Sequence, residues 1–222
     1  MAFGYQVHIA GAAQKKPLCC GRTYLSTGNV EKARELALQL STHLYDYVSK
    51  GIPVIGLEPS CLLTLRDEHL ALLDNNQAET VSQNAFLFEE FIARELDSGS
   101  LTPPPLKSPG AAIKVHGHCH QKSFNLMGTV SQTLNMLPDT NVDIIESGCC
   151  GMAGAFGYQK ETESVSRQMA SLDLVPAIES SAADTIIVAD GTSCRHQIAD
   201  CTSRSAQHVV QVLRSALVVA PV

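Results

Sequence analysis

The sequence lacks tryptophan, has few aromatic residues and carries no excess of positive charge. Only 5% of its 222 residues are aromatic, and 16 lysines and arginines stand against 22 acidic residues, which gives a formal charge of −6. Without a cationic surplus the chain has no global field that would grip a phosphate backbone, so nucleic acid is excluded as an expected partner. A membrane span is not expected either, because the apolar segment 216–221 is far shorter than the roughly 20 residues that cross a bilayer.

A secretory signal is also lacking, since the first residues, MAFGYQVHIAG, show no basic segment followed by an apolar one. We therefore expect a reducing, cytoplasmic compartment, with peripheral contact at the inner face of the membrane as an alternative. Cysteines in such a compartment are more often free thiols, metal ligands or catalytic groups than disulfides. The chain is 45% hydrophobic, enough for a folded core, and it has eight cysteines whose spacing becomes the main question.

The cysteines follow an internal repeat. Cys19-Cys20-Gly21 recurs 130 positions later as Cys149-Cys150-Gly151, and Ser60-Cys61 recurs 133 positions later as Ser193-Cys194. In both copies a helix-like segment and a short apolar run separate the two motifs, namely 31–48 and 52–57, then 162–178 and 185–189. Two related modules explain this pattern better than chance. The proline-rich segment 102–110 marks the linker, and we place the modules at 1–107 and 108–222.

Short apolar segments rich in β-branched residues alternate with helix-length segments. The strand candidates are 5–9, 52–57, 112–115, 142–145 and 185–188, and segment 66–96 is expected to form a helical insertion in the first module. This pattern predicts an α/β fold with two tandem Rossmann-like modules, each a short parallel sheet flanked by helices. Only 18 residues precede the first cysteine pair. We therefore expect the first module to be truncated at its N-terminus, in a fragment or a separate subunit.

Four cysteines of the second module each follow a predicted strand: Cys119, Cys149, Cys150 and Cys194. The carboxyl edge of an open parallel sheet is where ligands bind, and converging thiolates suit zinc, copper(I) or an iron–sulfur cluster. Adjacent cysteines fit poorly into a structural zinc site, whose pairs are usually separated by two to four residues. The pattern therefore favours a cluster, and small buried thiols at strand ends remain the alternative.

Five stretches resemble the cysteine-rich CCG-domain family, which includes a subunit of heterodisulfide reductase and the iron–sulfur subunit of glycolate oxidase. They are residues 18–22, 56–68, 116–122, 147–154 and 193–198. The stretches are most similar to the C-terminal part of fused FAD/iron–sulfur D-2-hydroxy acid dehydrogenases. The resemblance covers nearly the whole chain.

The resemblance implies a [4Fe–4S] cluster in the second module. A complete module of the family has an early cysteine, an adjacent pair and a C-x-x-C motif. The second module matches at Cys119, Cys149, Cys150 and Cys194, whereas Gly191 stands at the first position of its C-x-x-C motif. We therefore expect one cluster, bound by these four cysteines.

The first module matches less completely. It has Cys19, Cys20 and Cys61, but Glu58 stands at the first position of the C-x-x-C motif and the early cysteine is missing. We expect a weaker metal site there, such as zinc with Glu58 as an oxygen ligand, or no metal. Cys201 falls outside the repeat, and we interpret it as an ordinary buried thiol.

Polar residues surround the cysteines of the second module. His116, His118 and His120 flank Cys119, and each could hydrogen-bond to sulfur, couple protons, ligate a metal or belong to a polar loop. Of these we expect His118 and His120 beside the cluster. Arg195 and His196 follow the last cysteine of the motif. They could place positive charge beside an anionic cluster or substrate, or they could be solvated.

The resemblance implies the iron–sulfur region of an FAD-linked dehydrogenase of glycolate, D-lactate or D-2-hydroxyglutarate. Electrons would pass from flavin and ferredoxin-type clusters to this region, and then to a quinone or another acceptor. No G-x-G-x-x-G follows a predicted strand and no C-x₂-C-x₂-C occurs. We therefore place FAD and those clusters on a partner or a missing part, with no catalytic residue in this chain. A thiol/disulfide redox site, as in heterodisulfide reductases, and a zinc-holding docking module are the alternatives.

Overall fold

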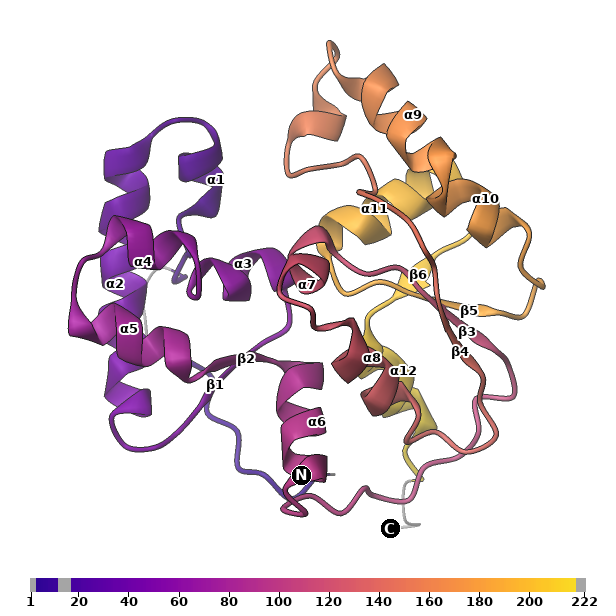
Figure 1. Cartoon of the computed structure of the whole chain (residues 1–222), viewed down its shortest axis with the longest axis horizontal. Helices are drawn as coiled ribbons and strands as arrows, with labels where there is room; N and C mark the ends of the chain where they lie inside the picture. Colours follow the sequence, from indigo (N-terminus) through magenta and orange to yellow (C-terminus); the bar gives the residue numbers. More distant parts are fainter. Residues whose placement is uncertain (1–2, 12–16, 219–222) are drawn as a thin grey trace. The chain divides into compact units, whose positions relative to one another are not determined.

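The computed structural model describes residues 3–11 and 17–218 (Figure 1). The chain divides into two compact units, the first ending at Phe91 and the second beginning at Ile92. The division falls inside a helix, whereas the sequence places the border between the repeated modules near residue 108. A compact unit and a repeated module need not end at the same residue, so the module border stays a prediction.

The first unit contains a two-stranded sheet and a set of short helices around one long helix. Its elements are α1 (Arg22–Ser26), α2 (Val30–Val48), β1 (Val54–Gly56), α3 (Pro59–Thr64), α4 (Glu68–Leu72), α5 (Asn76–Gln83), β2 (Ala85–Leu87) and the start of α6 (Phe88–Asp97). The two strands are parallel, with Val54 opposite Ala85. The side chain of Asn29 accepts a hydrogen bond from the Lys32 amide and so caps the long helix α2.

Two predictions for this unit are wrong. Residues 5–9 form no strand, and the side chains of Val7 and Ile9 are 61% and 76% exposed, so nothing buries this apolar segment. Conversely, β2 lies where a continuous helical insertion was expected. A strand of three residues carries too little periodicity to be distinguished from a helix. Residues 85–87 form a strand because they pair with β1, and the local sequence does not show this pairing.

The second unit is a parallel sheet with helices on both faces. After α6 it contains β3 (Ile113–Val115), α7 (Cys119–Ser123), α8 (Met127–Leu134), β4 (Val142–Ile144), a short 3₁₀ turn (Phe156–Tyr158), α9 (Glu163–Leu172), α10 (Leu174–Glu179), β5 (Ile186–Val188), α11 (Thr192–Cys201), β6 (Ala206–Gln207) and α12 (Val209–Ala216). Helices α8 and α12 lie on one face, and α9, α10 and α11 lie on the other (Figure 1). The predicted α/β class, with short parallel sheets flanked by helices, is confirmed.

The order of the strands reverses within this sheet. The strands are arranged β4-β3-β5-β6, and all neighbours are parallel. The chain therefore leaves β3 toward one side of the sheet to form β4, and then crosses to the other side of β3 to form β5. Ligands in open α/β sheets bind at the carboxyl ends of the two strands where the order reverses. His116 directly follows β3, and Gly191 lies three residues after the end of β5.

The glycine after each cysteine pair adopts a backbone conformation that favours glycine. Gly21 has φ +80° and Gly151 has φ +91°. A Cβ atom would lie 2.8 Å from the Ala33 carbonyl oxygen at Gly21, and 2.1 Å from the Ser166 carbonyl oxygen at Gly151. Ala33 and Ser166 are 133 positions apart, the same offset as the two Ser-Cys motifs. Both modules therefore pack the turn after the cysteine pair against the corresponding helix.

A hydrogen bond repeats in the same way. The Gly21 amide donates to Cys19 Sγ over 3.4 Å, and the Gly151 amide donates to Cys149 Sγ over 3.3 Å. The same turn thus forms in both units and holds the first sulfur of each pair. This agreement in local geometry supports the internal repeat that the sequence indicates.

We expect Gly151→Ala to destabilise the chain by about 3 kcal/mol or more, because positive φ costs an L-residue about 1–2 kcal/mol and the overlap with Ser166 adds to it. Gly154→Ala is the matched control, since Gly154 also has a positive φ but nothing lies within 4 Å of its Cβ position. That variant should lose only about 1–2 kcal/mol of stability, which is what a positive φ costs an L-residue. Urea unfolding of both variants measures the difference, and equal losses would show that the contact with the helix does not constrain the turn.

Candidate functional site

The four cysteines predicted in the second unit form a continuous row of contacts. Cys119 neighbours Cys149, Cys149 neighbours Cys150, and Cys150 neighbours Cys194, each pair close enough to shift the pKa of its members. Cys119 begins α7 after β3, Cys149 and Cys150 lie in the loop after β4, and Cys194 lies in the first turn of α11 after β5. Cys150 and Cys194 are buried, Cys149 is half-buried and Cys119 is exposed. The structure therefore brings all four together at the carboxyl edge of the sheet, along a line that runs from the core to the surface.

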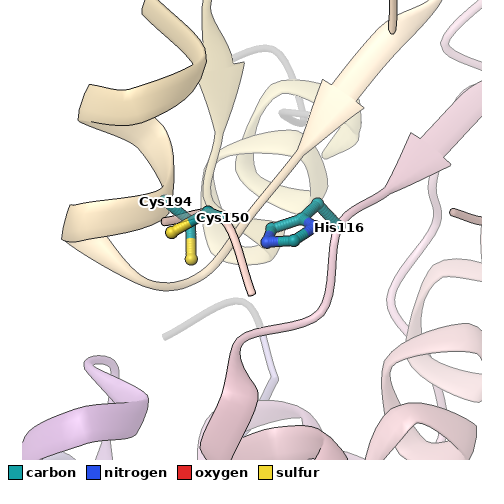
Figure 2. Close-up of side chains that lie close together, drawn as sticks. All are labelled: His116, Cys150 and Cys194. Atoms are coloured by element: carbon teal, nitrogen blue, oxygen red, sulfur yellow. The ribbon is translucent and has the colours of Figure 1, made fainter. Parts of the chain in front are cut away.

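His116 joins the buried end of this row. Its side chain is 1% exposed. One of its ring nitrogens lies within 4.8 Å of the sulfur atoms of Cys150 and Cys194, and the two sulfur atoms also lie within 4.8 Å of each other. Figure 2 shows the three side chains directed into the same space. The sequence pointed to all three histidines that flank Cys119, but it led us to expect His118 and His120, not His116, as neighbours of the cluster. Only the structure singles out His116, which directly follows β3.

The contacts between the thiols prepare two of them to bind a metal. Interaction with the neighbouring Cys119 and Cys150 thiols, with a hydrogen bond from the Gly151 amide, lowers the pKa of the Cys149 thiol. Interaction with Cys150 also lowers the pKa of Cys194. Thiolates rather than thiols bind metals. Cys149 and Cys194 are therefore the sulfurs on which negative charge is stabilised.

Helix α7 holds the first cysteine and the loop before the adjacent pair. It begins at His118, whose Nδ1 accepts a hydrogen bond from the His120 amide over 3.2 Å. The His118 amide in turn donates to Gln121 Oε1 over 3.0 Å, which completes a reciprocal cap. Lys122 Nζ donates to the carbonyl oxygens of Ser147 at 2.5 Å and Gly148 at 3.0 Å. The ammonium group thus links α7 to the turn that contains the cysteine pair.

Asp190 connects this helix to the rest of the sheet edge. Its side chain is 2% exposed, and its two oxygens accept hydrogen bonds from Gln121 Nε2 at 2.9 Å and from the Val209 amide at 3.0 Å. Asp190 directly follows the strand region of β5, so the carboxylate joins the start of α7, the end of β5 and the start of α12. The sequence did not indicate this residue, because its partners are distant along the chain.

The remaining polar residues predicted for this site have other contacts. Arg195 Nη1 donates to the carbonyl oxygens of Ala189 and Asp190, and so closes the loop after β5. His196 is exposed, and its Nδ1 lies 2.6 Å from the Tyr158 hydroxyl. The rings of His118 and His120 pack edge to face, with centroids 5.3 Å apart. A role for these residues beside a cluster stays a prediction.

The first unit brings together fewer donors. Cys20 and Cys61 are hydrogen-bonded, which lowers the pKa of Cys20 to about 6 and raises that of Cys61. Cys19 is exposed. Glu58 caps α3, and its Oε1 accepts from the Ser60 hydroxyl at 2.7 Å and from the Ser60 amide at 3.4 Å. The Cys20 thiol and burial raise the pKa of Cys61 most, and the negative charge of Glu58 adds to this; a metal site here stays a prediction.

A buried histidine fixes the cysteine pair of the first unit. His69 Nε2 lies 2.8 Å from the Cys20 carbonyl oxygen, and its Nδ1 lies 3.3 Å from Ser41 Oγ. A carbonyl can only accept, so Nε2 carries the hydrogen and the serine hydroxyl donates to Nδ1. Burial lowers the pKa of His69, which keeps the ring neutral. No motif in the sequence marked His69, because it lies within a segment predicted only as helical.

Cys201 has a different environment from the other thiols of the second unit. Its sulfur lies 3.8 Å from Arg167 Nη1, and burial raises its pKa.

Across the described parts of the chain, no helix is both long and apolar enough to cross a lipid bilayer.

The segment that contains this site matches a known sequence family. Residues 113–199, which include all four thiols of the row, match the sequence model of the cysteine-rich domain named CCG. The chain is 32% identical to one subunit of the anaerobic glycerol-3-phosphate dehydrogenase of Escherichia coli K12 over 206 residues, 91% of this chain and 50% of that protein. No solved structure matches the chain significantly. The predicted resemblance to CCG-domain proteins is confirmed.

More distant relatives are also dehydrogenases. The chain is 25% identical to D-2-hydroxyglutarate dehydrogenase of Escherichia coli K12, over 87% of this chain and 18% of that protein. It is 24% identical to the enzyme of the same name from Pseudomonas putida, over 80% of this chain and 16% of that protein. The chain thus spans half or less of the length of these relatives. What the whole proteins do does not transfer directly to this part.

We expect Asp190→Ala to lower the free energy of unfolding by about 2–3 kcal/mol, because it leaves a buried amide and the Gln121 side chain without their acceptor. Asp143→Ala is the control, because Asp143 is exposed on β4. Its effect should stay within about 0.5 kcal/mol. Urea unfolding measures both, and a loss for Asp190→Ala as small as the control would contradict the role of Asp190 in joining the three elements.

Proposed function

Because residues 113–199 carry a CCG domain, we propose that the second unit binds an iron–sulfur cluster and transfers electrons within a larger dehydrogenase. The ligands are Cys119, Cys149, Cys150 and Cys194. The observation that carries this proposal is the row of four thiols at the edge of the sheet where the strand order reverses. The number of thiols matches the number of ligands of a [4Fe–4S] cluster, which is held by four cysteine thiolates.

The donors present fit such a cluster. All four are sulfur, and the pKa of two of them is lowered by their neighbours. Cys150 and Cys194 belong to an apolar core that also contains Met152 and Ile145, whereas Cys119 is exposed. Burial, hydrogen bonds to sulfur and solvent exposure are the quantities by which a protein sets the potential of a cluster. The bound cluster would supply one-electron chemistry.

The residues around the thiols have separate tasks in this proposal. The Gly151 amide donates a hydrogen bond to Cys149 Sγ and so stabilises its thiolate. The Lys122 ammonium, tied to the neighbouring loop, lowers the pKa of Cys119 by its positive charge, although hydrogen bonding to Cys149 and burial raise it more. Met152, which is 1% exposed, fills the core beside the buried sulfurs and keeps water from that side.

The names of the relatives suggest the wider reaction. We propose that flavin in another subunit, or in a part of the protein outside this chain, oxidises a small hydroxy compound such as glycerol 3-phosphate or a D-2-hydroxy acid, glycolate and D-lactate included. The electrons then pass through ferredoxin-type clusters to the cluster of this chain, and onward to a quinone or another acceptor. The shared dehydrogenase names and the 91% coverage of this chain by one relative support this proposal.

A zinc site is the second candidate for the second unit. The observation that favours it is the group of His116, Cys150 and Cys194, because a nitrogen and two sulfurs are common ligands of zinc. Zinc would make the unit a structural or docking module. In the first unit, Cys20 and Cys61 with Glu58 and Cys19 remain our proposed weaker metal site.

Anaerobic purification, followed by reconstitution with iron and sulfide, tests the cluster. We expect a brown protein with about four irons and four sulfides per chain. Cys149→Ser should lose most of the iron, because Cys149 stands in the middle of the row of thiols. Cys201→Ser is the matched control and should retain it, and so should Cys19→Ser. Iron analysis, sulfide analysis and the absorption spectrum provide the measurements.

Two outcomes would contradict the proposal. A colourless protein with one zinc per chain and no iron would support the zinc module instead. Iron that is lost in Cys19→Ser but retained in Cys149→Ser would place the cluster in the first unit. In either case the four-thiol row of the second unit would not be the cluster site.

A further inference from the structure

We propose that His116 binds the metal centre directly through Nε2, beside Cys150 and Cys194, so that the ligand set of the second unit is mixed nitrogen and sulfur. This inference rests on the proposed function, because it concerns the same centre. It goes further in that it adds a ligand which the cysteine motif does not contain. It also makes His116 different in role from His118 and His120.

The first argument is distance. The donor atoms of His116, Cys150 and Cys194 all lie within 4.8 Å of one another in the metal-free structure. Donors around one tetrahedral ion, with bonds to sulfur and nitrogen of ordinary length, lie roughly 3.5 Å apart. A separation of at most 4.8 Å is therefore close enough for the three donors to belong to the same metal centre. All three side chains are at most 2% exposed, so they are already held in place by packing.

The second argument is the position of the imidazole hydrogen. His116 Nδ1 lies 2.9 Å from Ser147 Oγ. The serine hydroxyl also lies 3.5 Å from the Ile145 carbonyl oxygen, which can only accept, and 3.5 Å from Lys122 Nζ, which can only donate. All three contacts are satisfied together when the hydroxyl donates to Ile145 and accepts from His116 Nδ1, and we assign the ring hydrogen on this basis.

This tautomer leaves the lone pair of His116 on Nε2. Figure 2 shows that the ring nitrogen farther from the main chain faces the sulfur atoms of Cys150 and Cys194. Histidines that bind metals commonly donate their other ring hydrogen to an oxygen, which fixes the tautomer and the orientation of the ring. His116 with Ser147 has this arrangement before any metal is bound.

The third argument is the contrast with His118. Its Nδ1 accepts a hydrogen bond from the His120 amide, so in the neutral ring the hydrogen is on Nε2. Such a ring can donate to sulfur but has no lone pair available for a metal. His118 also occupies the space next to Gly191, where a Cβ atom would lie 2.4 Å from His118 Cδ2. No side chain fits at position 191 beside this ring, so an additional ligand has to come from another element, and His116 is the donor in reach.

The test compares His116→Gln with the matched control His118→Gln in the full chain, reconstituted anaerobically with iron and sulfide. Loss of a ligand should speed the release of iron to a chelator at least tenfold in His116→Gln, and much less in His118→Gln. Pulsed electron paramagnetic resonance of the reduced wild type should show coupling to an imidazole nitrogen. That coupling should persist in His118→Gln and disappear in His116→Gln.

His116→Cys keeps the test decisive if His116→Gln does not fold. This variant restores a donor at the same position, so it should load with iron as the wild type does. The nitrogen coupling should be absent, and the reduction potential should fall because a thiolate replaces a neutral ligand. Nitrogen coupling that survives in His116→Cys would overturn the inference.

The inference and the proposed function can fail separately. A wild type with a full cluster and no nitrogen coupling would overturn the role of His116 and leave the cluster in place. A wild type that binds no iron would overturn the cluster, and Co²⁺ then tests the ligand directly. A change in the visible Co²⁺ bands on His116→Gln, with none on His118→Gln, would support His116 as a ligand, whereas identical spectra in the wild type and His116→Gln would overturn it.

Discussion

The turn at Gly151 is the constraint on which the site of the second unit depends. Its φ of +91° and the absence of a side chain let the backbone approach the Ser166 carbonyl on α9. Because the chain bends there, two adjacent cysteines can serve different neighbours. Cys149 contacts Cys119 toward the surface, and Cys150 contacts Cys194 in the core. An adjacent pair, which is awkward for a small tetrahedral site, thus becomes the centre of an extended row of thiols.

The sheet supplies the second condition, since it brings three separate loops to that turn. The strand order β4-β3-β5-β6 places the ends of β3 and β5 side by side, with β4 next to β3. Asp190 then joins α7, β5 and α12 through buried hydrogen bonds. These bonds lie within the protein and need no metal. The donors are therefore positioned before a ligand binds, which reduces the entropy that binding would cost.

The two units show that the same turn can serve different sites. Gly21 packs against Ala33 as Gly151 packs against Ser166, and each glycine amide donates to the first sulfur of its pair. In the first unit, however, the contacts join only Cys20 and Cys61, and His69 fixes the cysteine pair through the Cys20 carbonyl. The turn is thus a structural element, whereas the number of donors that converge on it differs between the units.

The sequence by itself determined the α/β class, the repeat and the four cysteines of the second unit, because these depend on motifs that repeat at a fixed spacing along the chain. Only the tertiary structure decided which of three histidines faces the sulfurs, that β2 forms within a predicted helical segment, and that residues 5–9 form no strand. It also showed that Asp190 and His69 hold segments of the two sites in place through buried hydrogen bonds. Each of these depends on pairing or burial between residues that are distant along the chain, and three-residue strands have too little local pattern to reveal it.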